Sequence, residues 1–195
     1  MVAFVALALV SGCTIRRYVA EDYPQYLINN QGESHLPPTQ AASTYTLTPA
    51  TTTQFYEFRS AMAGHANLWV VEFGKMLDAT LQSRDVQGAF GRLTRAGAGD
   101  PGDGLLVFDL QRYEFTDMRA HIVLKVIHVE RGAEVFSRVY QADGDAQGGK
   151  VFWGGVFAMK NAVHQSTKLA LDEILRHMIA DLNSQSGPPD ARPAA

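Results

Sequence analysis

Residues 119–130 read Arg-Ala-His-Ile-Val-Leu-Lys-Val-Ile-His-Val-Glu, and this alternating stretch decides the fold. Consecutive side chains of a β-strand point to opposite faces of its sheet. One face of this segment carries the apolar side chains Ile122, Leu124 and Val126. The other face mixes charged and apolar side chains, namely His121, Val123, Lys125 and Ile127. The stretch therefore predicts a long strand with one face in the core and a second, open face.

The segments on either side predict further strands. Residues 130–133, Glu-Arg-Gly-Ala, are typical of a hairpin turn, and residues 134–142 return as the next strand. Residues 105–115 predict a preceding strand, with a bulge near Gln111 because the parity of the apolar positions changes there. Residues 43–49 indicate an edge strand or a first strand, and residues 150–157 indicate one more short strand.

Two segments have apolar residues three and four positions apart, which is typical of a helix with one buried face. They cover residues 65–86 and residues 161–183. The element order is then β-α-β-β-β-α. The sequence predicts an α+β fold, an antiparallel β-meander of about four strands with two long helices packed on one face.

The composition is that of one ordinary globular domain. The 195 residues are 46% hydrophobic and 19% charged, with a formal net charge of −3. Nucleic acid is not an expected partner, because the chain has no basic excess. A single cysteine, Cys13, excludes an intramolecular disulfide and a multi-cysteine zinc site.

The N-terminus carries the most informative motif of the chain. Residues 1–12 form an apolar run that is too short to span a bilayer and has the length of a signal-peptide core. Its end, Val10-Ser11-Gly12-Cys13, resembles the lipobox of bacterial lipoproteins. In those proteins a signal peptidase cuts before the cysteine, which then receives acyl chains such as palmitate. The pattern departs from the family in having no Lys or Arg before the apolar run, and an ordinary core cysteine on a buried strand is the alternative.

Acylation at Cys13 would fix the location of the protein. Each buried methylene contributes about 0.8 kcal/mol, so several acyl chains anchor stably where one does not. Thr14, rather than Asp, follows the cysteine. In Gram-negative lipoproteins the absence of Asp resembles the outer-membrane sorting signal. We therefore expect an outer-membrane, lipid-anchored protein that faces the periplasm.

The domain boundaries follow from composition. Residues 1–12 are expected to be the signal peptide, and residues 13–43 the lipidated cysteine and a flexible, Pro- and Gly-containing tether. Some apolar side chains of the tether could instead pack on the domain or on a partner: Tyr18, Tyr23, Tyr26, Leu27 and Ile28. Residues 44–183 form the single periplasmic domain, and residues 184–195 a disordered, Pro-rich tail.

No arrangement of residues predicts catalysis, a cofactor or a metal. A G-x-G-x-x-G sequence at residues 97–102 lies after a predicted helix and before a predicted strand, the reverse of the dinucleotide-binding order. His121 and His128 are seven apart on a strand and so face opposite ways. His164 and His177 are thirteen apart on a helix, about 20 Å of rise. We expect no catalytic, cofactor-binding or metal-binding residues.

Two places are candidate partner surfaces. Val123 and Ile127 lie on the face of the predicted sheet that points away from the helices. Phe152 and Trp153 belong to an aromatic segment, residues 152–157, that fits either the core or an exposed contact surface.

The combination of lipobox, first strand, helices and meander resembles two families, the YajG-type lipoproteins and the PqiC group of ABC-transport auxiliary lipoproteins. The resemblance rests on the lipobox, on residues 77–84 (Leu-Asp-Ala-Thr-Leu-Gln-Ser-Arg) and on the terminal helix at residues 170–182. It covers roughly residues 44–183 in element order. It implies a small periplasmic domain without catalytic residues, and only the lipidated cysteine can be carried over.

These expectations lead to one functional hypothesis and one alternative. The first is a non-enzymatic accessory of envelope lipid transport or outer-membrane assembly, with an envelope transport protein and phospholipid as candidate partners. The alternative is a lipid-tethered periplasmic ligand-binding module or hydrolase, which would need a pocket with at least two buried titratable side chains.

Overall fold

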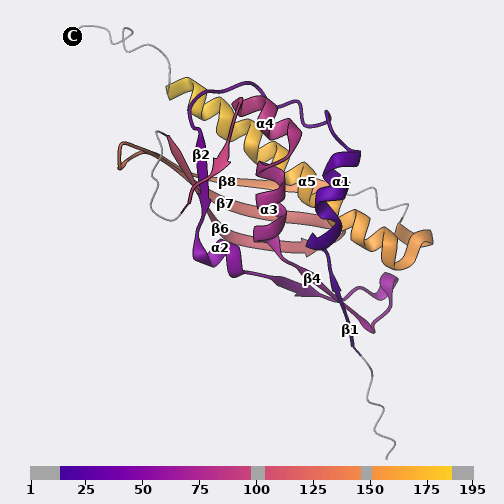
Figure 1. Cartoon of the computed structure of the whole chain (residues 1–195). Helices are drawn as coiled ribbons and strands as arrows, with labels where there is room; N and C mark the ends of the chain where they lie inside the picture. Colours follow the sequence, from indigo (N-terminus) through magenta and orange to yellow (C-terminus); the bar gives the residue numbers. More distant parts are fainter. Residues whose placement is uncertain (1–13, 98–103, 146–150, 186–195) are drawn as a thin grey trace, which may run out of the picture.

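The computed structural model of the chain describes residues 14–97, 104–145 and 151–185, apart from the side chains of residues 62 and 151–155. The strands form two sheets, one of five strands and one of three, and Figure 1 shows how the helices lie against them. In chain order the elements are β1 (Ile15–Tyr18), η1 (Ala20–Asp22), α1 (Tyr23–Asn29), β2 (Thr44–Leu47), α2 (Pro49–Thr53), β3 (Tyr56–Phe58), η2 (Ala61–Ala63), β4 (Asn67–Val71), α3 (Phe73–Leu81), α4 (Arg84–Phe90), β5 (Thr94–Arg95), β6 (Leu105–Thr116), β7 (Arg119–Glu130), β8 (Ala133–Asp145) and α5 (Val151–Gln185).

The five-stranded sheet has the order β5-β2-β6-β7-β8, and three of its strands, β6 to β8, form the antiparallel part of the predicted meander. β6, β7 and β8 are antiparallel neighbours, whereas β2 pairs in parallel with β6 and β5. The bulge expected near Gln111 is confirmed, since the register of β6 against β7 shifts between Leu110 and Arg112. The hairpin turn is also confirmed, with Arg131 and Gly132 at positive φ between β7 and β8.

The helices cover one face of this sheet. Ile122 and Leu124 of β7 are fully buried on that face. On the same face, Tyr113 of β6 contacts both covering helices: its hydroxyl hydrogen-bonds Thr167 of α5, and its ring lies 5.3 Å from that of Phe73 in α3. Figure 1 shows α1, α3 and α5 over β6–β8. The alternate side chains of β7 are only partly buried, so the opposite sheet face is open.

The helix predicted over residues 65–86 is wrong in its first third. That segment forms strand β4, then α3, and α4 begins at Arg84. β4 lies between β1 and β3 in the three-stranded sheet, and Trp69, Val70 and Val71 are all buried. A strand that is buried on both faces reads as a continuous apolar run, which periodicity alone does not distinguish from a buried helix. The aromatic and β-branched side chains favour the strand.

The fold class is thus α+β, but the structure is not a four-strand meander with two long helices. It has a second sheet, and the described residues include one long helix, α5, of 35 residues. The short strand expected at residues 150–157 is wrong, because α5 already begins at Val151. The apolar stripe predicted for the last helix is confirmed, since its members Val163, Leu171, Ile174, Met178 and Leu182 are buried.

The N-terminal segment is not a tether in the described structure. β1 pairs in parallel with β4, and α1 packs on α3. Val19, Tyr23 and Leu27 belong to the main hydrophobic core. The flexible tether expected over residues 13–43 is therefore wrong for the described part of that range. Its residues contact segments 40 or more positions away in the chain, and local composition does not indicate such contacts.

Candidate functional site

Cys13 lies just outside the described residues, but the structure fixes the residue after it. Thr14 is exposed and already held on the domain, because Arg59 Nη2 donates a hydrogen bond to Thr14 Oγ1 at 3.1 Å. The amide of Ile15 donates to the carbonyl oxygen of Ala66 at 2.9 Å and so starts β1. The residue after the predicted lipid anchor therefore already belongs to the folded domain, at the end of the three-stranded sheet.

A surface groove of about 410 Å³ begins at the same place. It lies between the β3–η2 segment and the β6–β7 hairpin, and the start of α5 contributes to it. Its apolar lining consists of Tyr56, Phe58, Phe115, Met118 and Met159, and its polar lining of Arg59, Ser60, Thr116 and Asp117. Sequence reasoning missed this groove because its lining residues come from three separate segments. The only signal was the apolar spacing of Tyr56 and Phe58.

Val123 and Ile127 lie on the open face of the five-stranded sheet, away from the helices. Both are partly exposed. Ile127 pairs with Val107 of β6. Lys125 lies between Val123 and Ile127 on the same face and pairs with Val139 of β8. The side chain of Val139 is 55% exposed. No helix covers this face in the described part of the chain. The two residues are brought together as neighbours on one surface.

Phe152 and Trp153 lie in the first turn of α5, and their side chains are outside the described residues. The structure therefore places their backbone on a helix rather than on a strand, and the candidate surface at these side chains stays a prediction.

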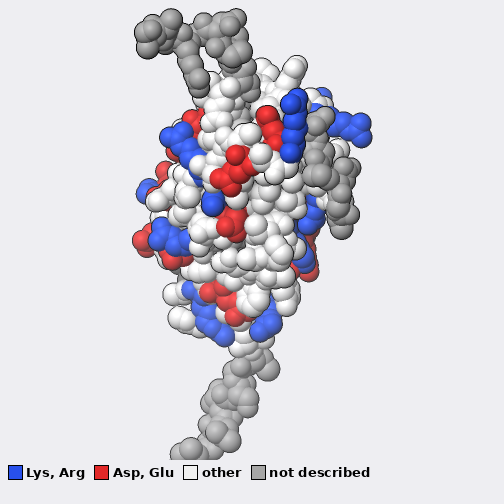
Figure 2. All heavy atoms as spheres, turned by 90° about the vertical axis from the view of Figure 1, so that its left-hand side faces the viewer, with Lys and Arg blue, Asp and Glu red and all other residues white. Residues whose placement is uncertain are grey.

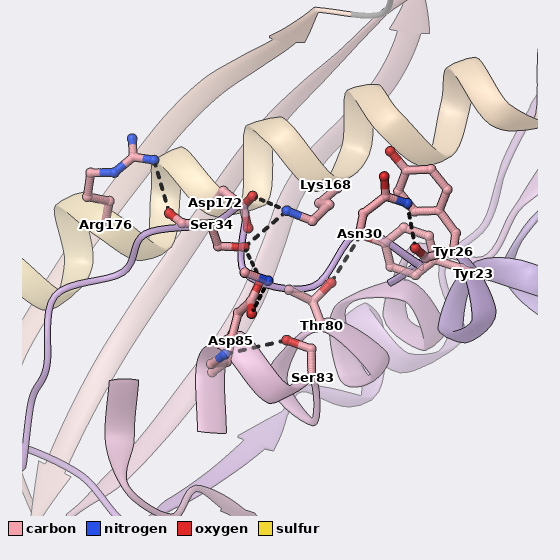
Figure 3. A network of polar contacts seen from close by, with 12 residues as sticks. Tyr23, Tyr26, Asn30, Ser34, Thr80, Ser83, Asp85, Lys168, Asp172 and Arg176 are labelled. Carbon is pink, nitrogen blue, oxygen red and sulfur yellow. Dashed lines mark hydrogen bonds and ion pairs between the residues drawn. The ribbon is translucent and has the colours of Figure 1, made fainter. Parts of the chain in front are cut away.

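A network of buried polar groups lies between α5, α4 and the segment after α1 (Figure 3). Lys168 and Asp172 of α5 are only 4% and 5% exposed and form an ion pair of 2.6 Å. Lys168 also donates to the hydroxyl of Ser34, which in turn donates to Asp85 at the start of α4. Burial raises the pKa of Asp172 from its ordinary value, against the opposing effect of Lys168. The network joins the N-terminal segment to α5.

The hydrolase alternative requires a pocket with at least two buried titratable side chains. Lys168 and Asp172 are two such side chains, so the remaining question is whether a pocket lies beside them. The adjoining cavity is about 10 Å³, lined by Ser34, Thr80, Asp85, Lys168 and Asp172 among others. That is room for about one water molecule and not for a substrate. The geometry is that of a structural ion pair.

A larger groove of about 440 Å³ lies between α1 and α3, over Leu27, Ile28 and Ala79, with a polar rim that includes Lys75 and Asp78.

A second buried contact holds the N-terminal segment. His164 Nε2 of α5 donates to the carbonyl oxygen of Val19 at 2.7 Å, and the rings of Tyr23 and Tyr26 lie 5.3 Å from the imidazole. Because a carbonyl oxygen only accepts, Nε2 carries the proton of the neutral ring. Burial lowers the pKa of His164 below its ordinary value of 6.5.

The surface shows no field of one sign on the side drawn in Figure 2, where positive and negative side chains are interspersed among large uncharged areas. In the described part of the chain, no group of three or more His, Cys, Asp or Glu side chains gathers in a way that could hold a metal ion. Of the helices in the described ranges, none is long and apolar enough to cross a membrane.

Comparison with known proteins yields structural likeness only. No family model and no curated protein matches the chain. A solved structure from Xanthomonas campestris, described as a DUF330 protein, is 16% identical, with a TM-score of 0.48 over 78% of this chain and 95% of that one. A Caulobacter crescentus protein described as a candidate lipoprotein is 18% identical, with a TM-score of 0.41 over 62% and 86%. A hypothetical protein of Chlamydia trachomatis is 13% identical, with a TM-score of 0.37 over 74% and 97%. Likeness at this level carries no functional argument, which rests on the residues of this chain.

Proposed function

We propose that this chain is a lipid-anchored protein of the bacterial cell envelope, held in the outer membrane by acyl chains on Cys13 and facing the periplasm. The observation that carries the proposal is the lipobox-like sequence at residues 10–13, directly followed by a folded domain. The apolar residues before this motif suit the core of a signal peptide that is removed.

The finer function that we propose is that of an accessory in envelope lipid transport or outer-membrane assembly. The open sheet face around Val123 and Ile127 supports this role. A half-apolar face without a covering layer suits a partner protein better than water, and charged neighbours such as Lys125 keep it soluble when it is free. We further propose that the protein is not an enzyme: its buried titratable groups Lys168 and Asp172 are paired with each other at 2.6 Å, and the cavity that they line is about 10 Å³.

The test is intact-mass spectrometry of the full-length protein, gently extracted from the membranes of its host. We expect a chain that begins at Cys13 and carries acyl chains, and a Cys13→Ala variant that keeps residues 1–12 and lacks the acyl mass. An unacylated wild-type chain would overturn the proposal.

A second variant tests the choice of membrane. By analogy with Gram-negative lipoproteins, Thr14→Asp should move the protein from the outer-membrane to the inner-membrane fraction of a density gradient. Asp can still accept the hydrogen bond from Arg59, so the fold around the anchor is kept. Equal distribution of wild type and variant would remove the basis for outer-membrane placement.

A further inference from the structure

The position of the anchor determines which end of the domain meets the membrane. Only Thr14 separates Cys13 from β1, and Thr14 is bound by Arg59. Consecutive Cα atoms are about 3.8 Å apart, so acyl chains on Cys13 would bring Thr14 and this end of the domain close to the membrane. The inference rests on the proposed acylation of Cys13.

The groove at this end begins at the same arginine that holds Thr14. Arg59 Nη1 donates to the carbonyl oxygen of His65, and Arg59 Nη2 donates to Thr14. A guanidinium has five N–H groups, so an exposed Arg59 keeps donors for a further acceptor. The groove therefore has one cation, Arg59, at its rim in contact with Thr14, and its other charged lining residue is Asp117.

The floor of the groove suits a hydrocarbon chain. Phe58 packs on Phe115 with ring centroids 5.1 Å apart, and Tyr56 packs on Tyr113 at 5.7 Å, so the aromatic wall is held in place without a ligand. Met118 and Met159 complete the lining, and methionine adapts its shape to irregular apolar ligands. The volume of about 410 Å³ is within the range of small-molecule sites.

We propose that this groove binds one acyl chain of a phospholipid from the anchoring membrane, with Arg59 at the phosphate. The acyl chains of the protein itself are the rival occupant, since they also start beside the groove. They carry no phosphate, however, and a guanidinium at the rim is matched to a phosphate group. Withdrawing the protein's own chains from the bilayer would also weaken its anchoring.

The experiment uses full-length acylated protein in vesicles of phosphatidylethanolamine and phosphatidylglycerol that contain a phospholipid with a diazirine in one acyl chain. After irradiation, mass spectrometry of peptides locates the attached lipid. We expect attachment to the peptides that contain Phe115, Met118 and Met159. A parallel set of vesicles carries the same diazirine chain on diacylglycerol, which has no phosphate, and we expect at least fivefold less attachment there.

Two variants make the test specific. Met118→Asp replaces part of the apolar lining by a second carboxylate beside Asp117, and Asp tolerates the positive φ of 63° at this turn. We expect it to reduce attachment at least fivefold. The control, Arg131→Asn, makes the same charge change at the β7–β8 turn, also at positive φ, and should leave attachment unchanged.

Several results would overturn the inference. These are attachment that Met118→Asp leaves unchanged, attachment concentrated in the α1–α3 groove at Leu27 and Ile28, or equal labelling by diacylglycerol. Acylated protein without labelling of the groove would overturn this inference alone and leave the proposed function standing. An unacylated Cys13 in the same sample would overturn the proposed function, and with it the reason to place the groove at the membrane.

Discussion

Gly144 in β8 and Ser166 in α5 meet backbone to backbone. A Cβ atom on Gly144 would lie 1.7 Å from the carbonyl oxygen of Ser166. The hydroxyl of Ser166 donates to the carbonyl oxygen of Gly144 at 2.6 Å and accepts from the amide of Ala120 at 2.5 Å. The long helix is thereby fixed to the ends of β7 and β8 by its closest approach to the sheet, and only glycine permits that approach.

The first prediction concerns this contact. Gly144→Ala should lower the free energy of unfolding by about 3 kcal/mol or more, because neither backbone can move away without breaking the Ser166 hydrogen bonds. Urea unfolding of the full-length protein measures the change. Gly88→Ala is the control, since a Cβ there meets nothing within 4 Å and alanine favours a helix by up to about 1 kcal/mol over glycine. Equal stability of the Gly144 variant and wild type would contradict the prediction.

The second prediction concerns the buried ion pair of Lys168 and Asp172. Lys168→Met should cost about 3–5 kcal/mol of stability, because it leaves a buried carboxylate without its cation. The double variant Lys168→Met with Asp172→Leu should recover most of that loss, since no unpaired charge is left. Denaturant unfolding of all four members of the cycle gives the coupling energy. Additive effects would show that the two side chains act independently.

The third prediction is a pH dependence that His164 controls. Its pKa is lowered by burial, so the neutral ring contributes stability above the ordinary value of 6.5, and this contribution is lost as the pH falls through the lowered pKa. The charges that face it are Lys160, which lowers the pKa, and Asp22, which raises it. Between pH 7.5 and pH 5 the advantage of wild type over His164→Gln should shrink by on the order of 1 kcal/mol.

Hydrogen exchange locates that effect. Amides of residues 19–29 should exchange faster at pH 5 than at pH 7.5 in wild type, after correction for the intrinsic rates, because burial disfavours the charged ring of His164 and opening of the segment packed on it exposes that ring to water. The pH dependence due to Asp172 has the opposite sign. Its pKa is raised, so its contribution to stability is fully present below pH 3.8 and is lost as the pH rises. Comparing wild type with His164→Gln cancels the Asp172 effect. An unchanged difference between the two proteins would contradict the prediction.

The fourth prediction tests the open sheet face. Val123→Lys and Ile127→Lys should each leave the unfolding free energy within about 0.5 kcal/mol of wild type, because both side chains are already partly exposed. Each should abolish recovery of a partner that wild type retains in a mild detergent extract. Ile122→Lys, on the buried side of the same strand, is the control and should unfold the domain. Retained partner binding in both surface variants would exclude this face.

The sequence predicted the strands β6 to β8 and the last helix because these are encoded locally. Alternation along β7 assigns its two faces, and the positive-φ turn at Arg131 and Gly132 sets the hairpin. The lipid anchor at Cys13 also rests on a local motif, and it stays a prediction. Where a segment is buried on all sides, as at Trp69 to Val71 in β4, local periodicity is lost, and the helix predicted there was wrong.

Tertiary structure alone decided how the N-terminal segment and the groove are formed. Val19 meets His164 across 145 positions of the chain, and Arg59 meets Thr14 across 45. Such contacts depend on which elements pack together, and no local pattern of residues encodes them. The amino-acid sequence by itself determined the alternating strands and the terminal helix, and it contains the lipobox-like motif on which the proposed anchor rests. The three-dimensional packing decided that the chain after Cys13 folds onto the domain, because burial of Tyr23 and Leu27 in the shared core outweighs the freedom of a tether.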